Sequence, residues 1–232
     1  MQHPTKNAYA YCNVPQSKWI IIFVHWLTSS KDEEMFVQAE KFFSENNYST
    51  VRFNLYWDLP WEKKLKDVGL SDNIQDVNEV VNYYKSEWFK KIFLVWHSYW
   101  WIVNLYVNHE NISWILMWDS SIWWPWLLED VHEDESGEYY IDWWNWYRFY
   151  ISEKLYRDFQ IPSEEFLEKL KEIKLPIKIF AAENWLSKAA ERYFEVANEP
   201  KELSIIKWAY HTFEDWWIEE LLSQSLEWIN NN

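Results

Sequence analysis

The chain has 232 residues, a length that fits one domain with a sizeable core. Its formal charge of −15 argues against nucleic acid or an anionic membrane surface as a partner. A single cysteine, Cys12, excludes an intramolecular disulfide framework and fits a reducing compartment, while no signal peptide and no membrane span is visible. We therefore expect a cytoplasmic protein.

The first half of the chain alternates between apolar runs typical of strands and segments with helical spacing. Strands are predicted at Ser17–Val24, Thr50–Tyr56, Lys91–Val95 and Ser113–Met117. Helices are predicted at Asp32–Asn47, Ser71–Ser86 and Tyr99–His109. Because each crossover between parallel strands needs a helix to return the chain, the alternation predicts an α/β fold with a mostly parallel, doubly wound sheet.

The alternation stops at Ile122 and resumes after Leu175. The intervening stretch is aromatic and acidic, with weaker helical patterns near Ile141–Tyr156 and Ser163–Ile173. An insertion of this size usually covers the carboxyl edge of the sheet, where ligands bind. We therefore expect a single domain over residues 1–232 with a helical cap, or lid, over 122–175. The remaining predicted elements are strands at Pro176–Ala182 and Glu202–Lys207 and helices at Lys188–Ala197 and Phe213–Ile229.

Glycine is scarce and tryptophan abundant. The chain has 2 Gly and 21 Trp, whereas average usage would give about 16 Gly. Many Trp positions are places where glycine is common, such as Trp88 between a helical pattern and a strand, or the pair Trp100-Trp101. We hypothesise that most of these positions were glycine in a parent sequence. The alternative is a natural Trp-rich protein, such as a carbohydrate binder with aromatic platforms.

A serine stands where the strand pattern at Lys91–Val95 turns into a helical one, in the sequence Trp96-His97-Ser98-Tyr99-Trp100. In nucleophilic hydrolases such a junction has the sequence G-x-S-x-G and forms a sharp turn that exposes the serine oxygen above the sheet. A serine hydroxyl also needs a general base to take its proton, and in such hydrolases this base, a histidine, lies near the end of the sequence. His211 meets that requirement, in a short loop between the last predicted strand and the last helix.

These motifs resemble those of the α/β-hydrolase superfamily, particularly its esterase, acylglycerol-lipase and serine-aminopeptidase-like branch with a lid. The matching sequences are His25-Trp26 for H-G, residues 96–100 for G-H-S-x-G, and Trp208-Ala209-Tyr210-His211 for a pattern near G-x-G-H. The similarity extends from about Ser17 to the C-terminus. It implies Ser98 as nucleophile and His211 as general base. It also implies an oxyanion hole made by the backbone N–H groups of Leu27 and Tyr99.

The triad acid has two candidates. The resemblance places the acid after the penultimate strand. An ungapped comparison with the family pattern puts it at position 185, which is Trp, and Glu183 is the acidic residue near that position. We predict Glu183. Asp119, at the end of the strand that follows the nucleophile, is the alternative position used in some lipases. His25 and His97 are interpreted as packing or loop-ordering residues.

The function implied is that of a serine esterase acting on a small-molecule ester or acyl substrate, with an amide or peptide as the nearest variant. No cluster with metal-ligand spacing and no phosphate-binding glycine loop occurs, so neither a metal nor a cofactor is expected. The alternative is a hydrolase-fold binding or interaction protein without turnover.

The sharp turn around Ser98 is called the nucleophile elbow, and in the family the two positions beside it are glycines, which have no Cβ. Tryptophan at positions 96 and 100 therefore predicts overpacking at the elbow. A third interpretation is therefore a chain that misfolds or is inactivated by Gly-to-Trp replacement, derived from an active parent.

Overall fold

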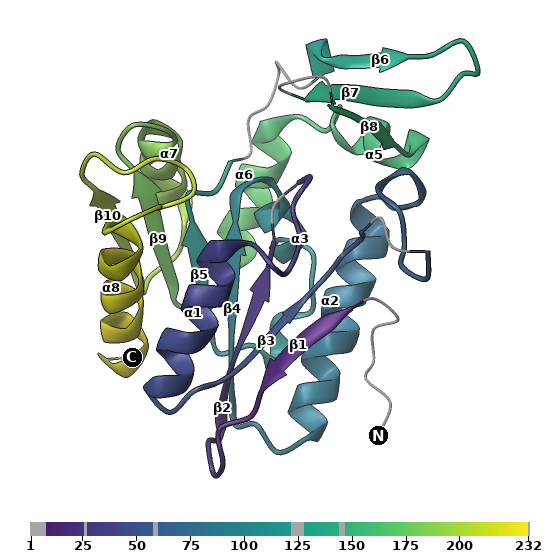
Figure 1. Ribbon diagram of the computed structural model, residues 1–232. Helices are drawn as coiled ribbons and strands as arrows, with labels where there is room; N and C mark the ends of the chain where they lie inside the picture. The colour runs from purple at the N-terminus through teal and green to yellow at the C-terminus, as the bar shows by residue number, and fades with distance from the viewer. Residues whose placement is uncertain (1–7, 26, 58–59, 122–127, 144–146, 232) are drawn as a thin grey trace.

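A seven-stranded sheet runs through the middle of this computed structural model, which describes residues 8–25, 27–57, 60–121, 128–143 and 147–231 (Figure 1). The strand order is β1-β3-β2-β4-β5-β9-β10. The strands are β1 (Tyr9–Cys12), β2 (Trp19–Val24), β3 (Ser49–Phe53), β4 (Lys91–His97), β5 (Trp114–Trp118), β9 (Ile177–Ala182) and β10 (Lys201–Ile206).

The prediction of a mostly parallel sheet is confirmed. Neighbouring strands from β3 to β10 pair in parallel, and only β1 runs antiparallel, against β3 at one edge. The edge strand β1 was not predicted, because its four residues alternate between exposed and half-buried positions and form no apolar run. Parallel pairing brings the carboxyl ends of β2, β4, β5, β9 and β10 to one edge, so the loops that follow them can form a common site.

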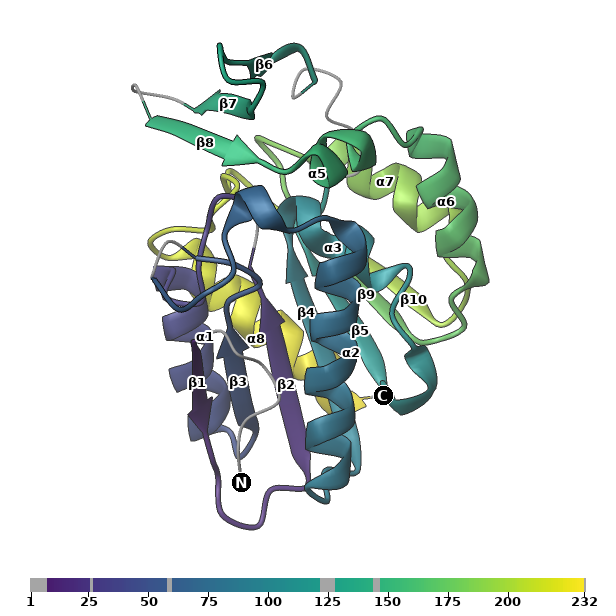
Figure 2. The same ribbon diagram turned by 90° about the vertical axis from the view of Figure 1, so that its right-hand side faces the viewer.

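Helices cover both faces of the sheet, as the alternating pattern predicts. The helices packed on these faces are α1 (Glu34–Glu45), α2 (Leu70–Ser86), α3 (Trp101–Asn104), α7 (Ser187–Val196) and α8 (Trp217–Asn231). Strand β2 shows how the core divides: Ile20 and Ile22 join the cluster that contains residues of α2, α3 and α7, whereas Ile21 and Phe23 join the cluster of α1 and α8. Figure 2 shows α2 and α3 in front of the sheet and α8 behind it.

Short 3₁₀ helices occur at Leu65–Asp67 (η1), Ser98–Trp100 (η2) and His109–Asn111 (η3). Among the described residues, no helix is long and apolar enough to cross a bilayer.

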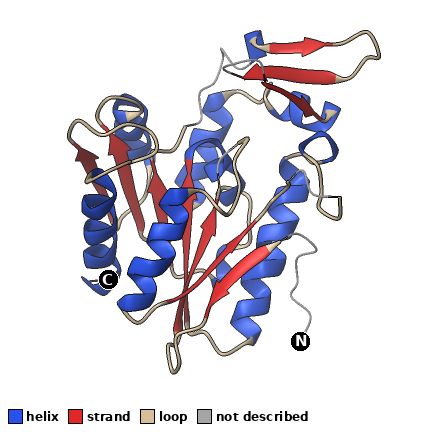
Figure 3. Cartoon of the chain, viewed as in Figure 1, coloured by secondary structure: helices blue, strands red, loops and turns tan. Residues whose placement is uncertain are grey.

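Between β5 and β9 the chain adds a small sheet that lies beyond the carboxyl ends of the parallel strands, and a helix that lies beside α7 (Figure 3). This segment contains an antiparallel sheet of β6 (Val131–Glu133), β7 (Tyr139–Trp143) and β8 (Tyr147–Ile151), followed by α5 (Glu153–Asp158) and α6 (Ser163–Glu172). Helix α6 matches its prediction. The helix predicted over Ile141–Tyr156 is wrong for most of its length, because β7 and β8 occupy it. Residues 122–127, the start of the predicted cap, lie outside the described residues.

The turn between β6 and β7 explains why these two strands form a hairpin. Gly137 has φ of 84°, and the Asp134 carboxylate accepts hydrogen bonds from the backbone N–H groups of Ser136 and Glu138, at 2.8 and 3.1 Å. An Asp and a Gly in these positions are typical of a hairpin turn.

Among the described residues, four tryptophans lie fully buried in the core: Trp96, Trp100, Trp101 and Trp118. Other tryptophans occupy backbone conformations that favour glycine, since Trp88 has φ of 82° and Trp208 has φ of 64°. Both positions fit the hypothesis of a glycine-containing parent. The expectation that the replacements cause misfolding or inactivity stays a prediction.

Candidate active site

Ser98 lies in a strained turn at the end of β4. The strand ends at His97, and the chain passes through η2 directly into α3. Ser98 has φ of 60°, in the left-handed region that non-glycine residues adopt rarely and that clusters at functional sites. This is the strand-to-helix geometry that the sequence around Ser98 predicts.

The Ser98 hydroxyl contacts His211, which comes from the loop between β10 and α8. Ser98 Oγ lies 2.9 Å from His211 Nε2. The backbone of His211 is held in turn by His97, whose Nε2 lies 2.7 Å from the His211 carbonyl oxygen. Since a carbonyl only accepts, His97 Nε2 carries the proton. His97 therefore orders the loop of His211, in agreement with the role expected for it.

Asp119 is the carboxylate that the structure brings to His211. It follows β5, is fully buried, and its Oδ2 lies 2.5 Å from His211 Nδ1. Its Oδ1 accepts a hydrogen bond from the backbone N–H of Ala182 at 2.9 Å. Burial raises the pKa of Asp119, while the hydrogen bonds from His211 and from the backbone of Ala182 and Leu186 oppose that rise.

This arrangement fixes the protons of the site. An ionised Asp119 accepts the proton of His211 Nδ1, which leaves Nε2 unprotonated and able to accept the Ser98 hydroxyl proton. Ser98, His211 and Asp119 thus form a continuous chain of hydrogen bonds.

Glu183, the acid predicted from the sequence, lies elsewhere. Its Oε2 accepts a hydrogen bond from the backbone N–H of Trp208 at 2.9 Å, and the residue is exposed. The carboxylate therefore joins the β9–α7 loop to the β10–α8 loop instead of contacting His211. Trp185, where the ungapped comparison falls, places its indole centroid 5.7 Å from the His211 ring.

The two predicted oxyanion-hole residues follow adjacent strands. Leu27 comes after β2 and Tyr99 comes after β4, and these strands pair in parallel up to Val24 and Trp96. Both residues are buried. His25 accepts a hydrogen bond at Nε2 from the backbone N–H of Leu55, 3.0 Å away, which ties the end of β2 to the segment after β3. Trp26, the second residue of the matching H-G motif, lies outside the described residues.

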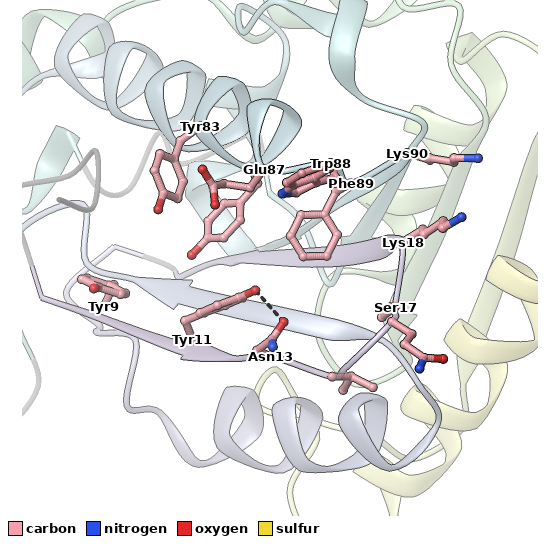
Figure 4. Close-up of a pocket in the computed structure, with 13 residues that line it drawn as sticks. Tyr9, Tyr11, Asn13, Ser17, Lys18, Tyr83, Glu87, Trp88, Phe89 and Lys90 are labelled. Carbon is pink, nitrogen blue, oxygen red and sulfur yellow. Dashed lines mark hydrogen bonds between the residues drawn. The ribbon is translucent and has the colours of Figure 1, made fainter. Parts of the chain in front are cut away.

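A pocket of about 670 Å³ lies away from these residues, beside the edge strand β1 and the C-terminal end of α2 (Figure 4). Its wall combines polar side chains with six aromatic ones: Tyr9, Tyr11, Tyr83, Tyr84, Trp88 and Phe89. This pocket could not be predicted from the sequence, because its aromatic residues come from two segments distant in the chain. Within the described parts of the chain, no group of three or more His, Cys, Asp or Glu side chains is placed to hold a metal ion.

Comparison with known proteins gives matches at the level of structure only. No family model and no curated protein matches the chain. Est1E from Butyrivibrio proteoclasticus, solved with ferulic acid bound, is 16% identical with a TM-score of 0.77, covering 97% of this chain and 94% of that one. A monoacylglycerol lipase from Paleococcus ferrophilus is 15% identical with a TM-score of 0.74, covering 97% and 98%.

A lipase-esterase related protein from Clostridium acetobutylicum is 15% identical with a TM-score of 0.69, covering 96% of this chain and 99% of that one. These similarities span nearly the whole length of each protein. Together with the strand order, the turn at Ser98 and the place of the inserted segment, they show that the chain has the fold of the α/β-hydrolase superfamily.

Proposed function

We propose that the chain is a serine hydrolase that cleaves carboxylic esters through an acyl-enzyme on Ser98. The observation that carries the proposal is the hydrogen-bonded chain from Ser98 Oγ through His211 to Asp119, at 2.9 and 2.5 Å. This arrangement is a nucleophile, a general base and an orienting carboxylate on the loops of one sheet edge. Asp119, not Glu183, takes the part of the acid in this proposal.

The acylation half follows from these positions. Ser98 Oγ attacks the ester carbonyl carbon while its proton moves to His211 Nε2, and Asp119 stabilises the resulting imidazolium. The backbone N–H groups of Leu27 and Tyr99 hydrogen-bond the carbonyl oxygen as it becomes negative. The bond between the acyl carbon and the alcohol oxygen then breaks, and the alcohol leaves with the proton from His211.

Hydrolysis of the acyl-enzyme repeats these steps with water. His211 removes a proton from the water as the water oxygen attacks the acyl carbon, and then returns a proton to Ser98 Oγ as the acid departs. An amide substrate would use the same residues, with protonation of the leaving nitrogen by His211.

We also propose that residues 122–175 act as a cap on a single domain. The described part of this segment touches the nucleophile turn, because the Phe159 ring, just after α5, lies 5.3 Å from the Tyr99 ring in an edge-on contact. Closing this side limits the entry of water and substrate to the site.

Turnover of p-nitrophenyl acetate and labelling by a fluorophosphonate test the function. The wild-type chain should turn over the ester and form an adduct at Ser98. Ser98→Ala should lose the adduct and lower kcat by about 10⁴- to 10⁶-fold. Ser163→Ala, which changes another buried serine at the start of α6, is the matched control. A folded wild-type chain without turnover or adduct would leave a chain inactivated by Gly-to-Trp replacement or a hydrolase-fold binding protein, and absence of an adduct on the glycine-restored chain would favour the binding protein.

A further inference from the structure

One hydroxyl group connects the two segments that carry the proposed oxyanion donors. Thr28 follows Leu27, and its backbone N–H donates to Tyr56 Oη at 3.0 Å. Trp100 follows Tyr99, and its indole Nε1–H donates to the same Tyr56 Oη at 2.9 Å. The residue after each proposed donor is therefore bonded to a single buried oxygen.

Tyr56 is well placed to act as a fixed point. It follows β3, is 3% exposed, and packs edge-on against His25 with ring centroids 5.2 Å apart. The neighbouring Leu55 donates its backbone N–H to His25 Nε2. The turn after β2 is thus hydrogen-bonded at both ends to the segment after β3: His25 bonds to Leu55, and Thr28 bonds to Tyr56. Leu27 lies between His25 and Thr28 in the chain.

The turn needs such support because its backbone is strained. Thr28 has φ of 65°, a left-handed conformation that is rare for a β-branched residue. Conformations of this kind persist where the surrounding contacts determine them, and they cluster at functional sites. The hydrogen bond to Tyr56 acts directly on the strained residue, so it helps determine where the preceding N–H points.

Trp100 adds a connection that glycine could not make. The motif that residues 96–100 resemble has glycine at position 100, which carries no donor beyond its backbone. Here the indole at this position is fully buried and reaches from the nucleophile elbow to Tyr56. The elbow and the turn after β2 are therefore linked through side chains as well as through the sheet.

We propose that Tyr56 and Trp100 are positioning residues that set the separation between the two oxyanion-hole N–H donors, Leu27 and Tyr99. The inference rests on the proposed esterase function. An oxyanion hole works only when its donors are fixed at the place where negative charge develops, so a shift of one donor lowers the rate without preventing substrate binding.

The test is kinetic, with Tyr56→Phe, Trp100→Phe and the double variant. Loss of a whole oxyanion donor costs about 10²- to 10³-fold in kcat, so a displaced donor should cost less. We expect kcat to fall about 10- to 30-fold in Tyr56→Phe and about 3- to 10-fold in Trp100→Phe, with KM within about 3-fold. The Ki of a trifluoromethyl ketone, which binds as an oxyanion, should rise in parallel with the loss in kcat.

The double variant separates a positioning role from ordinary packing. If Trp100 acts through Tyr56, the double variant should be no slower than Tyr56→Phe alone, because the acceptor is already gone. Independent packing effects would instead multiply. If Tyr56→Phe does not fold, Trp100→Phe carries the test, since it leaves the bond between Thr28 and Tyr56 in place.

Two controls match these changes. Tyr48→Phe removes another buried tyrosine hydroxyl, which lies 2.7 Å from Asn230 Oδ1. Trp96→Phe shortens a buried indole on the other side of Ser98 that has no hydrogen-bond partner among the described residues. Each should change kcat less than its counterpart, with folding followed by circular dichroism.

Three results would overturn the proposal: Tyr56→Phe behaving like Tyr48→Phe, losses that multiply in the double variant, or a rise in KM alone. In each of them wild-type turnover depends on Ser98, so the esterase function stands. A wild-type chain without Ser98-dependent turnover would instead remove the proposed function and the positioning role together.

Discussion

The Asp119 carboxylate lies 2.5 Å from His211 Nδ1, on the opposite side of the imidazole from Ser98. It is fixed on its own other side, where the backbone N–H of Ala182 donates to it. Asp119 has φ of 41°, so the chain leaves β5 in an uncommon conformation. A carboxylate held in this way can select one tautomer of His211.

Replacing Asp119 by Asn should therefore abolish most activity. An amide in this position favours the wrong tautomer of His211 and leaves the imidazolium without a counter-charge, which lowers kcat by about 10³- to 10⁴-fold. Glu183→Gln keeps an acceptor for the Trp208 N–H and should stay within about 3-fold of wild type. Steady-state kinetics on p-nitrophenyl acetate compares the two, and the reverse order of effects would return the acid role to Glu183.

The choice between these acids shows where sequence reasoning ends. Asp119 follows β5 and Glu183 follows β9, and these strands are neighbours in the sheet. Both residues therefore arrive at the same edge, as the sequence predicts. Which carboxylate turns toward His211 depends on the backbone angles of a few loop residues, and no periodic pattern encodes them.

The parallel strands and the serine turn could be predicted because each depends on local patterns. Continuous apolar runs mark β2, β4 and β5, and the junction at Ser98 has a recognisable order of residue types. The antiparallel strand β1 was missed because a short, half-exposed strand carries little apolar signal, whereas β7 and β8 lie in an aromatic stretch whose spacing indicates a helix. The bonds from Thr28 and Trp100 to Tyr56 could not be predicted, since they join three distant segments through one side-chain oxygen.

His97 should make the protein less stable as the pH falls. Burial, followed by the charge of His211, lowers the pKa of His97 well below its ordinary value. The unfolded chain thus binds a proton near pH 6.5 that the folded chain does not, so stability is complete above that pH and is lost as the pH falls below it. We expect a decrease of about 1 kcal/mol per pH unit from His97 between pH 6 and 5.

Urea unfolding of wild type and His97→Gln between pH 7.5 and 5 measures this loss. Glutamine can donate to the His211 carbonyl but does not titrate, so the variant should show a shallower slope. His109 is half-buried and its pKa is also lowered by burial, so its own variant, His109→Gln, gives the size of a second such contribution. Equal slopes in wild type and His97→Gln would contradict the prediction.

Gly69 allows the inserted segment to contact α2. A Cβ at this position would lie 2.8 Å from Lys154 Cβ and 2.9 Å from Asp158 Oδ2, the oxygen that accepts the N–H of Leu70 at 2.6 Å. Gly69→Ala should therefore push α5 away and lower the free energy of unfolding by about 1–3 kcal/mol. Gly137→Ala, where the nearest atom is 3.6 Å away and only the φ of 84° is unfavourable, should cost about 1 kcal/mol. Chemical denaturation compares them, and a harmless Gly69→Ala would show that α5 shifts freely.

Trp88 offers the most direct test of the glycine hypothesis. Its backbone has φ of 82° and its side chain is 86% exposed, so the indole contributes little packing while the conformation is strained. Trp88→Gly should raise the free energy of unfolding by about 1 kcal/mol, reduced by the greater freedom of glycine in the unfolded chain. For a chain of this size the melting temperature should rise by about 2–4 °C.

Trp61→Gly is the control, because Trp61 is 67% exposed and its φ lies outside the left-handed region. The control should gain nothing, since glycine there adds unfolded-state freedom and relieves no strain. Equal changes in the two variants, measured by thermal melting, would remove the argument that position 88 is built for glycine.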